Sequence, residues 1–208
     1  MTALRRIGPS ALLRTSLFAP LAALSLAACG LNSVPTAEEN VNAEFGNLQA
    51  EYQRRNDLIG NLVETVKAAA GSEEQILTQV TEARSRATSV TLTPEQLDDP
   101  QAVRAYNDAQ AGLSNARSLL GTVIVERYPQ LQSQQRFGDL MVALEGTENR
   151  IRTQRRDYNE AVRGYNTTIR TFPDAIGAKI FYGAKPKVPF EEAAGAQEAP
   201  PVDFGNAT

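Results

Sequence analysis

Apolar residues recur every three or four positions through most of the chain between residues 37 and 172. This spacing is that of an amphipathic helix with one buried face. Four such stripes can be traced, from Val41 to Val66, from Ile76 to Val90, from Tyr106 to Val123 and from Phe137 to Phe172. We therefore predict four helices, and at about 1.5 Å per residue the first and the fourth would each be roughly 50 Å long.

Polar residues and prolines mark the expected ends of these helices. Three sequences fit the capping box, in which two otherwise unpaired backbone donors are satisfied reciprocally. They are Thr36-x-x-Glu39, Ser72-x-x-Gln75 and Thr93-x-x-Gln96, and Asp99-Pro100 offers a second start for the third helix. Tyr128-Pro129 and Phe172-Pro173 would end the third and fourth helices, because proline disfavours helical geometry in the residue before it.

The stripes also predict how the helices assemble. Short connections favour antiparallel neighbours, so the pattern predicts an all-α fold, an elongated antiparallel four-helix bundle over residues 37–172. A two-helix hairpin with looser middle segments is the alternative, but it would leave two stripes unburied. Residues 173–190 retain aromatic residues and are a candidate for packing on the bundle end. Residues 191–208 are rich in Ala, Pro and Gly and are expected to be disordered.

The N-terminal segment has the layout of a secretory signal. Basic residues are followed by an uncharged apolar run, which is shorter than the ~20 residues that a membrane span requires. Leu26-Ala27-Ala28-Cys29 resembles the lipobox of bacterial lipoproteins, in which the cysteine is acylated and cleavage leaves it as the first residue. We therefore predict a signal peptide over residues 1–28 and a lipidated linker over residues 29–36. An ordinary signal peptide with Cys29 as a stray thiol is the alternative.

A cleaved leader would place the rest of the chain outside the cytoplasm, held at a membrane through Cys29. Gly30 follows the cysteine, whereas aspartate is the usual signal for retention at an inner membrane. In a host with two membranes we therefore expect the outer membrane, facing the periplasm. The leader carries three arginines and no acidic residue, so its removal moves the net charge from −3 to −6. An acidic chain is a poor candidate for nucleic-acid binding.

The sequence contains no histidine and one cysteine, which restricts the chemistry available to it. Ser-His and Cys-His nucleophile systems are excluded, and the commonest ligand of zinc is missing. Carboxylate pairs occur at Glu38-Glu39, Glu73-Glu74 and Asp98-Asp99, where predicted helix starts explain them through the helix dipole. Glu145 and Glu148 lack the histidine partner that a di-iron bundle needs. We therefore predict no catalytic residue, no metal site and no cofactor.

Polar residues interrupt the two longest stripes and form a candidate polar layer. If the first and fourth helices are antiparallel with flush ends, Arg55 lies opposite Tyr158, where it could stack on the ring. The same alignment places Arg54 opposite Asn159 and Asp57 opposite Arg156. The layer would comprise Arg54, Arg55, Asp57, Arg155, Arg156, Tyr158 and Asn159. We favour the interpretation that it fixes helix register, as polar positions do in coiled coils, over a binding site.

Three segments resemble the LemA family of bacterial membrane-associated proteins. They are YQRRNDLIGNLVETV at 52–66, EGTENRI at 145–151 and RRDYNEAVRGYNTTIRTFPD at 155–174. The resemblance implies a helical bundle held at a membrane and exposed outside the cytoplasm, with no agreed catalytic residues. Two features depart from the family pattern: Gly60 stands where proline is expected, and many members have a transmembrane helix instead of a lipobox.

These observations favour a non-enzymatic interaction or scaffold module, anchored through acylated Cys29 and binding an envelope protein or polymer. A ligand-binding sensor that uses the polar layer is the first alternative. A cell-wall hydrolase that works with carboxylates alone is the second.

Overall fold

The computed structural model of the chain describes residues 9–70, 74–132 and 134–191, with side chains described for 32–68, 75–128, 130–131 and 134–191. Within these residues every regular element is helical, which confirms the all-α class. The long helices are α1 (Pro9–Ala70), α2 (Glu74–Ser89), α3 (Pro100–Arg127) and α5 (Gln135–Thr168). The short elements are α4 (Pro129–Gln132), α6 (Asp174–Gly177), a 3-10 turn (Pro94–Gln96) and a π-helical turn (Ala178–Tyr182).

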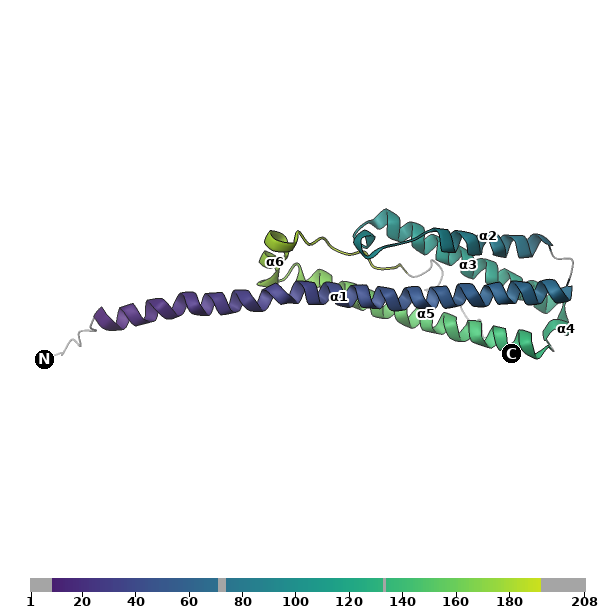
Figure 1. The fold of residues 1–208 in the computed structure, drawn as a ribbon, viewed down its shortest axis with the longest axis horizontal. Coiled ribbons are helices and arrows are strands. Elements are labelled where there is room, and N and C mark those ends of the chain that lie inside the picture. The colour runs from purple at the N-terminus through teal and green to yellow at the C-terminus, as the bar shows by residue number, and fades with distance from the viewer. Residues whose placement is uncertain (1–8, 71–73, 133, 192–208) are drawn as a thin grey trace, which may run out of the picture.

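The helices form an elongated body in which α1 and α5 lie side by side over most of the length of α5 (Figure 1). α2 folds back beside α1 and packs mainly on α3. Among the α1 side chains that the structure describes, the first buried one is Val34 and the last is Val66. At about 1.5 Å per residue the packed part of α1 is therefore roughly 50 Å long. No helix within the described part of the chain combines the length and apolar character needed to cross a bilayer.

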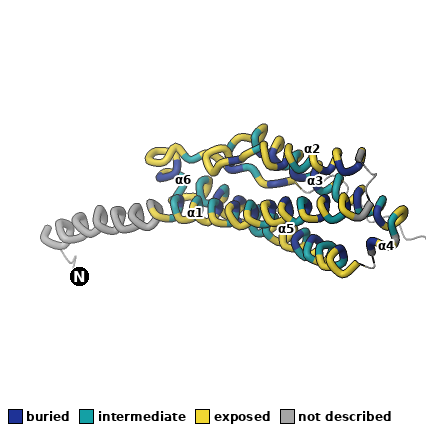
Figure 2. Tube along the Cα trace, turned by 45° about the vertical axis from the view of Figure 1, so that its right-hand side comes forward, coloured by how far each residue is buried: buried dark blue, intermediate teal, exposed yellow. Residues whose placement is uncertain are grey.

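Side-chain burial follows the predicted stripes, with buried positions recurring along the inward face of each helix (Figure 2). On α1 the buried stripe residues are Val41, Phe45, Leu48, Tyr52, Arg55, Ile59, Leu62 and Val66, as predicted. The fourth stripe is confirmed from Phe137 to Tyr165, but Phe172 is 78% exposed. The helix ends at Thr168, so Phe172 lies beyond the face that the periodicity describes.

The predicted helix start at Thr36 is wrong, whereas the third long helix uses the second of its two predicted starts, Asp99-Pro100. The Thr36 hydroxyl donates to the backbone carbonyl of Asn32 (2.7 Å) within a continuing helix, so no helix begins at Thr36. The third long helix starts after Asp99, whose carboxylate accepts from the backbone N–H of Gln101 (2.8 Å). The Thr93 sequence instead begins the short 3-10 turn. The predicted start at Ser72 lies outside the described residues, as do residues 192–208 of the predicted tail.

The segment after α6 runs back along α5 as an extended strap, residues 184–191. Two asparagines of α5, seven residues apart, each make two hydrogen bonds to the strap backbone. The side chain of Asn166 pairs with the N–H and C=O of Lys187 (2.9 and 2.8 Å), and that of Asn159 does the same with Phe190 (2.8 and 2.9 Å). A spacing of two helical turns places both asparagines on one side of α5, which explains the repeated Tyr-Asn pair in this part of the sequence.

The strap carries Phe190 into the core, where its side chain is 2% exposed. Its ring centroid lies 4.9 Å from that of Tyr158, 6.1 Å from that of Tyr106 and 6.4 Å from that of Phe45. Offset and edge-on aromatic contacts at these separations stabilise beyond the area they bury. The strap thus completes an aromatic core that α1, α3 and α5 leave open between them.

We predict that Phe190→Ala lowers the free energy of unfolding by about 3 kcal/mol, because it removes a buried ring and leaves a cavity among three others. Phe181→Ala is the matched control, since Phe181 is 68% exposed and should change stability by less than about 0.5 kcal/mol. Equilibrium denaturant unfolding measures both variants. Equal losses for the two variants would show that the strap is not part of the core.

Candidate functional site

Arg55 of α1 is the largest fully buried side chain described in the protein, with 2% of its surface exposed. It lies where the interior divides into two clusters. The aromatic cluster contains Tyr52 and Ile151, and the aliphatic cluster contains Ile59 and Leu144. A buried guanidinium costs several kcal/mol in lost hydration unless partners satisfy it. The surrounding helices must therefore supply those partners.

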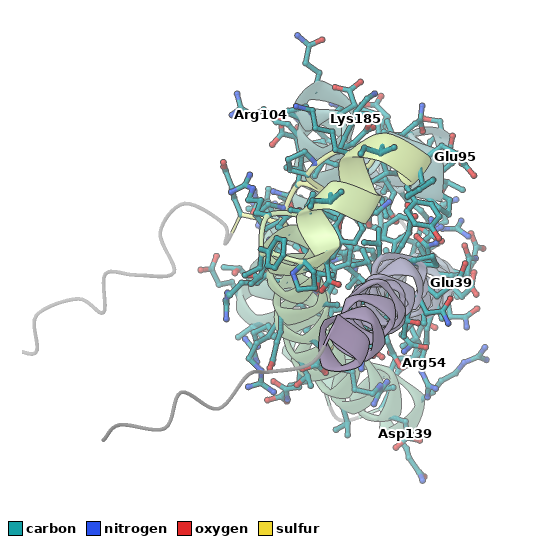
Figure 3. The ribbon with its side chains drawn as sticks, turned by 90° about the vertical axis from the view of Figure 1, so that its left-hand side faces the viewer. Glu39, Arg54, Glu95, Arg104, Asp139 and Lys185 are labelled. Atoms are coloured by element: carbon teal, nitrogen blue, oxygen red, sulfur yellow. The ribbon has the colours of Figure 1, made fainter. Side chains whose placement is uncertain are left out.

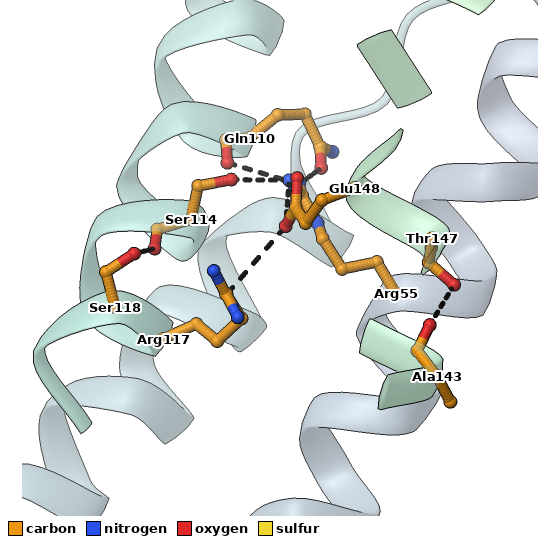
Figure 4. Close-up of polar contacts among 8 residues, drawn as sticks. All are labelled: Arg55, Gln110, Ser114, Arg117, Ser118, Ala143, Thr147 and Glu148. Carbon is orange, nitrogen blue, oxygen red and sulfur yellow. Dashed lines mark hydrogen bonds and ion pairs between the residues drawn. The ribbon is translucent and has the colours of Figure 1, made fainter. Parts of the chain in front are cut away.

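The partners come mainly from α3 (Figure 4). One terminal nitrogen of Arg55, Nη2, donates to the side-chain oxygen of Gln110 (2.7 Å) and to its backbone carbonyl (3.1 Å). The other, Nη1, donates to the hydroxyl of Ser114 (2.6 Å). Hydrogen bonds from a charged donor are short and about twice as strong as neutral ones. Arg55 therefore ties α1 to two successive turns of α3.

The charge of Arg55 is balanced by Glu148 on α5. Their nearest atoms are 3.5 Å apart, and Arg117 of α3 approaches the same carboxylate oxygen at 4.0 Å. The contact with α2 is made by Gln110, whose side-chain amide donates to the carbonyl of Ala87 (3.1 Å). Residues from all four long helices thus meet at one level. We call Arg55, Gln110, Ser114, Arg117 and Glu148 the arginine layer.

Tyr52, one turn before Arg55, closes the layer on the aromatic side. The guanidinium carbon of Arg55 lies 5.0 Å from the centre of the Tyr52 ring, within the range of a cation–π contact. Burial raises the pKa of Tyr52 above its ordinary value, although the charges of Arg155 and Arg55 act in the opposite direction. The phenol therefore stays neutral and gives Arg55 a polarisable face.

The pairing predicted for Arg55 and Tyr158 is wrong. Phe45 is the α1 residue that contacts Tyr158, with ring centroids 5.9 Å apart, and Arg55 pairs with Glu148. The alignment is displaced by about ten residues, or roughly 15 Å, because the helix ends are not flush. Helix α5 ends at Thr168, and α1 continues toward the N-terminus beyond the last turn of α5.

Three of the predicted layer residues lie on the surface instead. Arg54 is exposed and its side chain points outward (Figure 3). Asp57 is exposed and accepts from the Gln53 amide (3.0 Å). The side chain of Arg156 is 74% exposed and lies 3.7 Å from the Asp157 carboxylate. The predicted Arg54–Asn159 and Asp57–Arg156 pairs are therefore not formed.

The remaining predicted residues hold the strap. The Tyr158 hydroxyl donates to the carbonyl of Val188 (3.0 Å), beside the two hydrogen bonds that Asn159 makes with the backbone of Phe190. Arg155 donates to the Asn107 side chain (3.3 Å) and to the carbonyl of Glu191. Of the seven predicted residues, Arg55 therefore belongs to the arginine layer, three hold the strap, and the other three lie on the surface.

Sequence reasoning missed Gln110 and Ser114 as partners of Arg55. Glu148 carried a visible signal, since it is a charged residue at a position of the fourth apolar stripe. Gln110 gave no such signal, because Ala109 beside it fits the third stripe equally well. The buried glutamine is recognised only when the rotation of α3 about its own axis is known.

A groove of about 360 Å³ opens beside the arginine layer, between α1 and the α2–α3 pair. Gln49, Gln53, Asn56, Thr88 and Gln110 contribute polar groups to its lining. Asn56 is 7% exposed and donates to the Thr88 hydroxyl (2.9 Å). Its carbonyl oxygen is buried and has no hydrogen-bond partner among the described residues. Asn56 therefore places an unpaired acceptor in the wall of the groove.

We predict that Gln110→Leu lowers the free energy of unfolding by about 2–3 kcal/mol. The substitution removes the shortest acceptor of the Arg55 Nη2 group and also unpairs the carbonyl of Ala87. Gln101→Leu, at an exposed position of the same helix, is the control and should have little effect. Denaturant unfolding of both variants provides the measurement. A Gln110→Leu protein as stable as the control would mean that Arg55 is satisfied by other groups.

The sequence comparisons agree with the resemblance seen in the motifs. The model of the LemA family matches residues 44–204. Magnetosome proteins MamQ 2 and MamQ 1 of Paramagnetospirillum magneticum are each 29% identical to this chain over 188 residues, covering 81% of it and 69% of their own length. MamQ of Magnetospirillum gryphiswaldense is 29% identical over 158 residues, covering 68% of this chain and 58% of its own. Because the family match spans far more than half of the sequence, the chain belongs to the LemA family.

Proposed function

We propose that this LemA-family chain is a lipid-anchored, non-enzymatic interaction or scaffold protein. It stands as an antiparallel four-helix bundle on a membrane, outside the cytoplasm. The observation that carries the proposal is the continuity of α1, which contains both Cys29 and the core residues from Val34 onward. An acyl group on Cys29 would therefore hold the rod through a helix that is itself part of the core.

The use of the buried charges supports a structural and binding role. Arg55 and Glu148 connect helices to one another. Lys187 of the strap is 7% exposed and pairs with Glu38 of α1 (3.0 Å). These ionic groups are held in contacts that connect one element to another. A rigid rod of this kind presents long side surfaces to an envelope protein or polymer.

We predict that Cys29→Ser abolishes acylation and releases the protein from the membrane fraction or leaves it uncleaved. Without its acyl chains the protein loses the apolar area that a stable membrane anchor requires. Metabolic labelling with an alkyne fatty acid, followed by fractionation, measures both effects. Asn32→Ser, three residues further along, is the control and should keep the label.

Label that persists in Cys29→Ser would contradict the anchor.

The interaction role is tested separately by mild crosslinking of the wild-type protein in intact cells. We expect recovery of a discrete envelope protein or polymer. Release of soluble fragments from peptidoglycan by the purified protein would contradict the non-enzymatic role and favour the hydrolase alternative.

The groove beside the arginine layer favours a second candidate, a sensor that holds a small polar molecule against Asn56. Its buried acceptor oxygen would gain a donor from such a ligand. Native mass spectrometry of protein extracted from its own membrane tests this candidate. A sensor would carry an added mass that Asn56→Leu loses, whereas a wild-type protein with no added mass would eliminate the groove as a binding site.

A further inference from the structure

Large apolar side chains gather where the rod meets the projecting part of α1. Eight large hydrophobic residues are exposed within the described part of the chain, and five of them lie between residues 172 and 182. They are Phe172, Ile176, Ile180, Phe181 and Tyr182, with exposed fractions from 46% to 78%. We call these five residues the apolar knob. Its segment, with α6, lies beside α1 at the end from which α1 projects (Figure 1).

In this segment the small residues are buried and the large apolar residues are exposed, which is the reverse of ordinary core packing. Its buried residues are the small Gly177 and Ala178, which pack toward the aromatic cluster. Its large residues point away from that cluster, and Phe181 is 68% exposed. Exposed apolar patches of this kind mark surfaces that meet a partner or a membrane.

The residues around the knob favour a lipid surface as that partner. Residues 170–185 contain the basic Arg170, Lys179 and Lys185 and one acidic residue, Asp174, although the chain as a whole has a net charge of −3. Lys185 pairs with Asp98 (3.1 Å), so Arg170 and Lys179 are the basic residues that could face headgroups. Aromatic and basic side chains together are typical of segments that lie in the membrane interface. Protein–protein interfaces are depleted in lysine, whereas Lys179 stands next to Ile180 and Phe181.

The position of the knob also fits a membrane. Val34 of α1 is buried and packs in the same cluster as Ala178. Cys29 lies five residues earlier on the same helix, or about 7.5 Å along its axis. Interfacial segments bury their apolar face about 5–10 Å into the boundary between headgroups and acyl chains. Lipid attached at Cys29 would therefore bring the knob to the surface of the same membrane.

We propose that the apolar knob inserts into the interfacial region of the membrane that carries the lipidated Cys29, with Arg170 and Lys179 facing anionic headgroups. This proposal rests on the lipid anchor of the proposed function. Two contacts, one covalent and one through the knob, fix the tilt of the rod where a single tether would leave it free to swing. The rod then presents a defined face to its partner in the envelope.

Tryptophan fluorescence tests the knob, because the sequence contains no tryptophan. Phe181→Trp places a single indole in the knob, which we call the knob indole. Val142→Trp is the matched control, since Val142 is 71% exposed on α5, in the half of that helix remote from the knob. Each mature, lipidated protein, residues 29–208, is reconstituted on vesicles of phosphatidylcholine and phosphatidylglycerol with brominated acyl chains. We expect the emission of the knob indole to shift to the blue and to be quenched by the bromines, and that of the control indole to stay unchanged.

Charge is tested in the same background. Adding Lys179→Glu to Phe181→Trp should reduce the quenching of the knob indole severalfold on vesicles that contain phosphatidylglycerol and have a smaller effect on phosphatidylcholine alone. Equal effects on both vesicles would overturn the role given to the anionic headgroups.

Flotation of the vesicles separates the knob from the anchor. Protein that floats while the knob indole stays unquenched keeps the anchor and overturns the knob. Protein that fails to float, yet shows the knob indole quenched on adding vesicles, supports the knob and removes the anchor. Absence of both signals overturns both proposals.

A blue-shifted knob indole without lipid, together with a doubled mass in solution, would show that the knob pairs two copies of the chain and would also overturn the membrane proposal.

Discussion

The burial of one arginine charge constrains the whole structure. Arg55 sits at 2% exposure between two apolar clusters, where removing its partners would leave an uncompensated cation. Its donors reach Gln110, Ser114 and Glu148, and Gln110 extends the network to the backbone of α2. Sliding or rotating any one helix would break at least one of these contacts. The layer therefore selects one alignment among the many that apolar stripes alone would accept.

The interior is packed by different kinds of residue in the two halves of the rod, on either side of the arginine layer. On one side aliphatic residues such as Leu62, Leu113 and Leu144 fill the interior. On the other side aromatic rings from α1, α3 and α5 leave a space that Phe190 of the strap fills. Asn159 and Asn166 satisfy the strap backbone, which would otherwise lie unpaired against a helix. The half with the strap is also the half nearest Cys29. The strap therefore stabilises the end of the rod to which the proposed anchor is attached.

Periodicity predicted the helices and their buried faces because a 3-4 repeat directly reports which side of a helix avoids water. The residues of the α1 stripe, Arg55 included, are buried as expected. Alignment between helices was not predictable in this way. Because the stripes repeat at every turn, they do not determine how far one helix is shifted along the other. The predicted pairing of Arg55 with Tyr158 therefore depended on where the helices end, and α5 ends at Thr168 rather than at Phe172. Aromatic residues in 173–190 led us to expect packing on the bundle end, and Phe190 is buried in the core. The path of the strap along α5 was not predicted because it has no periodicity, and only the Tyr-Asn repeat of α5 indicated a second set of contacts there.

A double-mutant cycle between Arg55 of α1 and Glu148 of α5 tests most directly whether the arginine layer couples the helices. Arg55→Met, Glu148→Met and the double variant are compared with the wild type by the free energy of unfolding. Glu148→Met leaves the buried Arg55 without its carboxylate partner, and Arg55→Met leaves the half-buried Glu148 with the more distant Arg117 alone. The double variant should therefore lose at least about 1 kcal/mol less than the two single losses together. Losses that add within about 0.5 kcal/mol would contradict the account, since the two groups would then stabilise the rod independently.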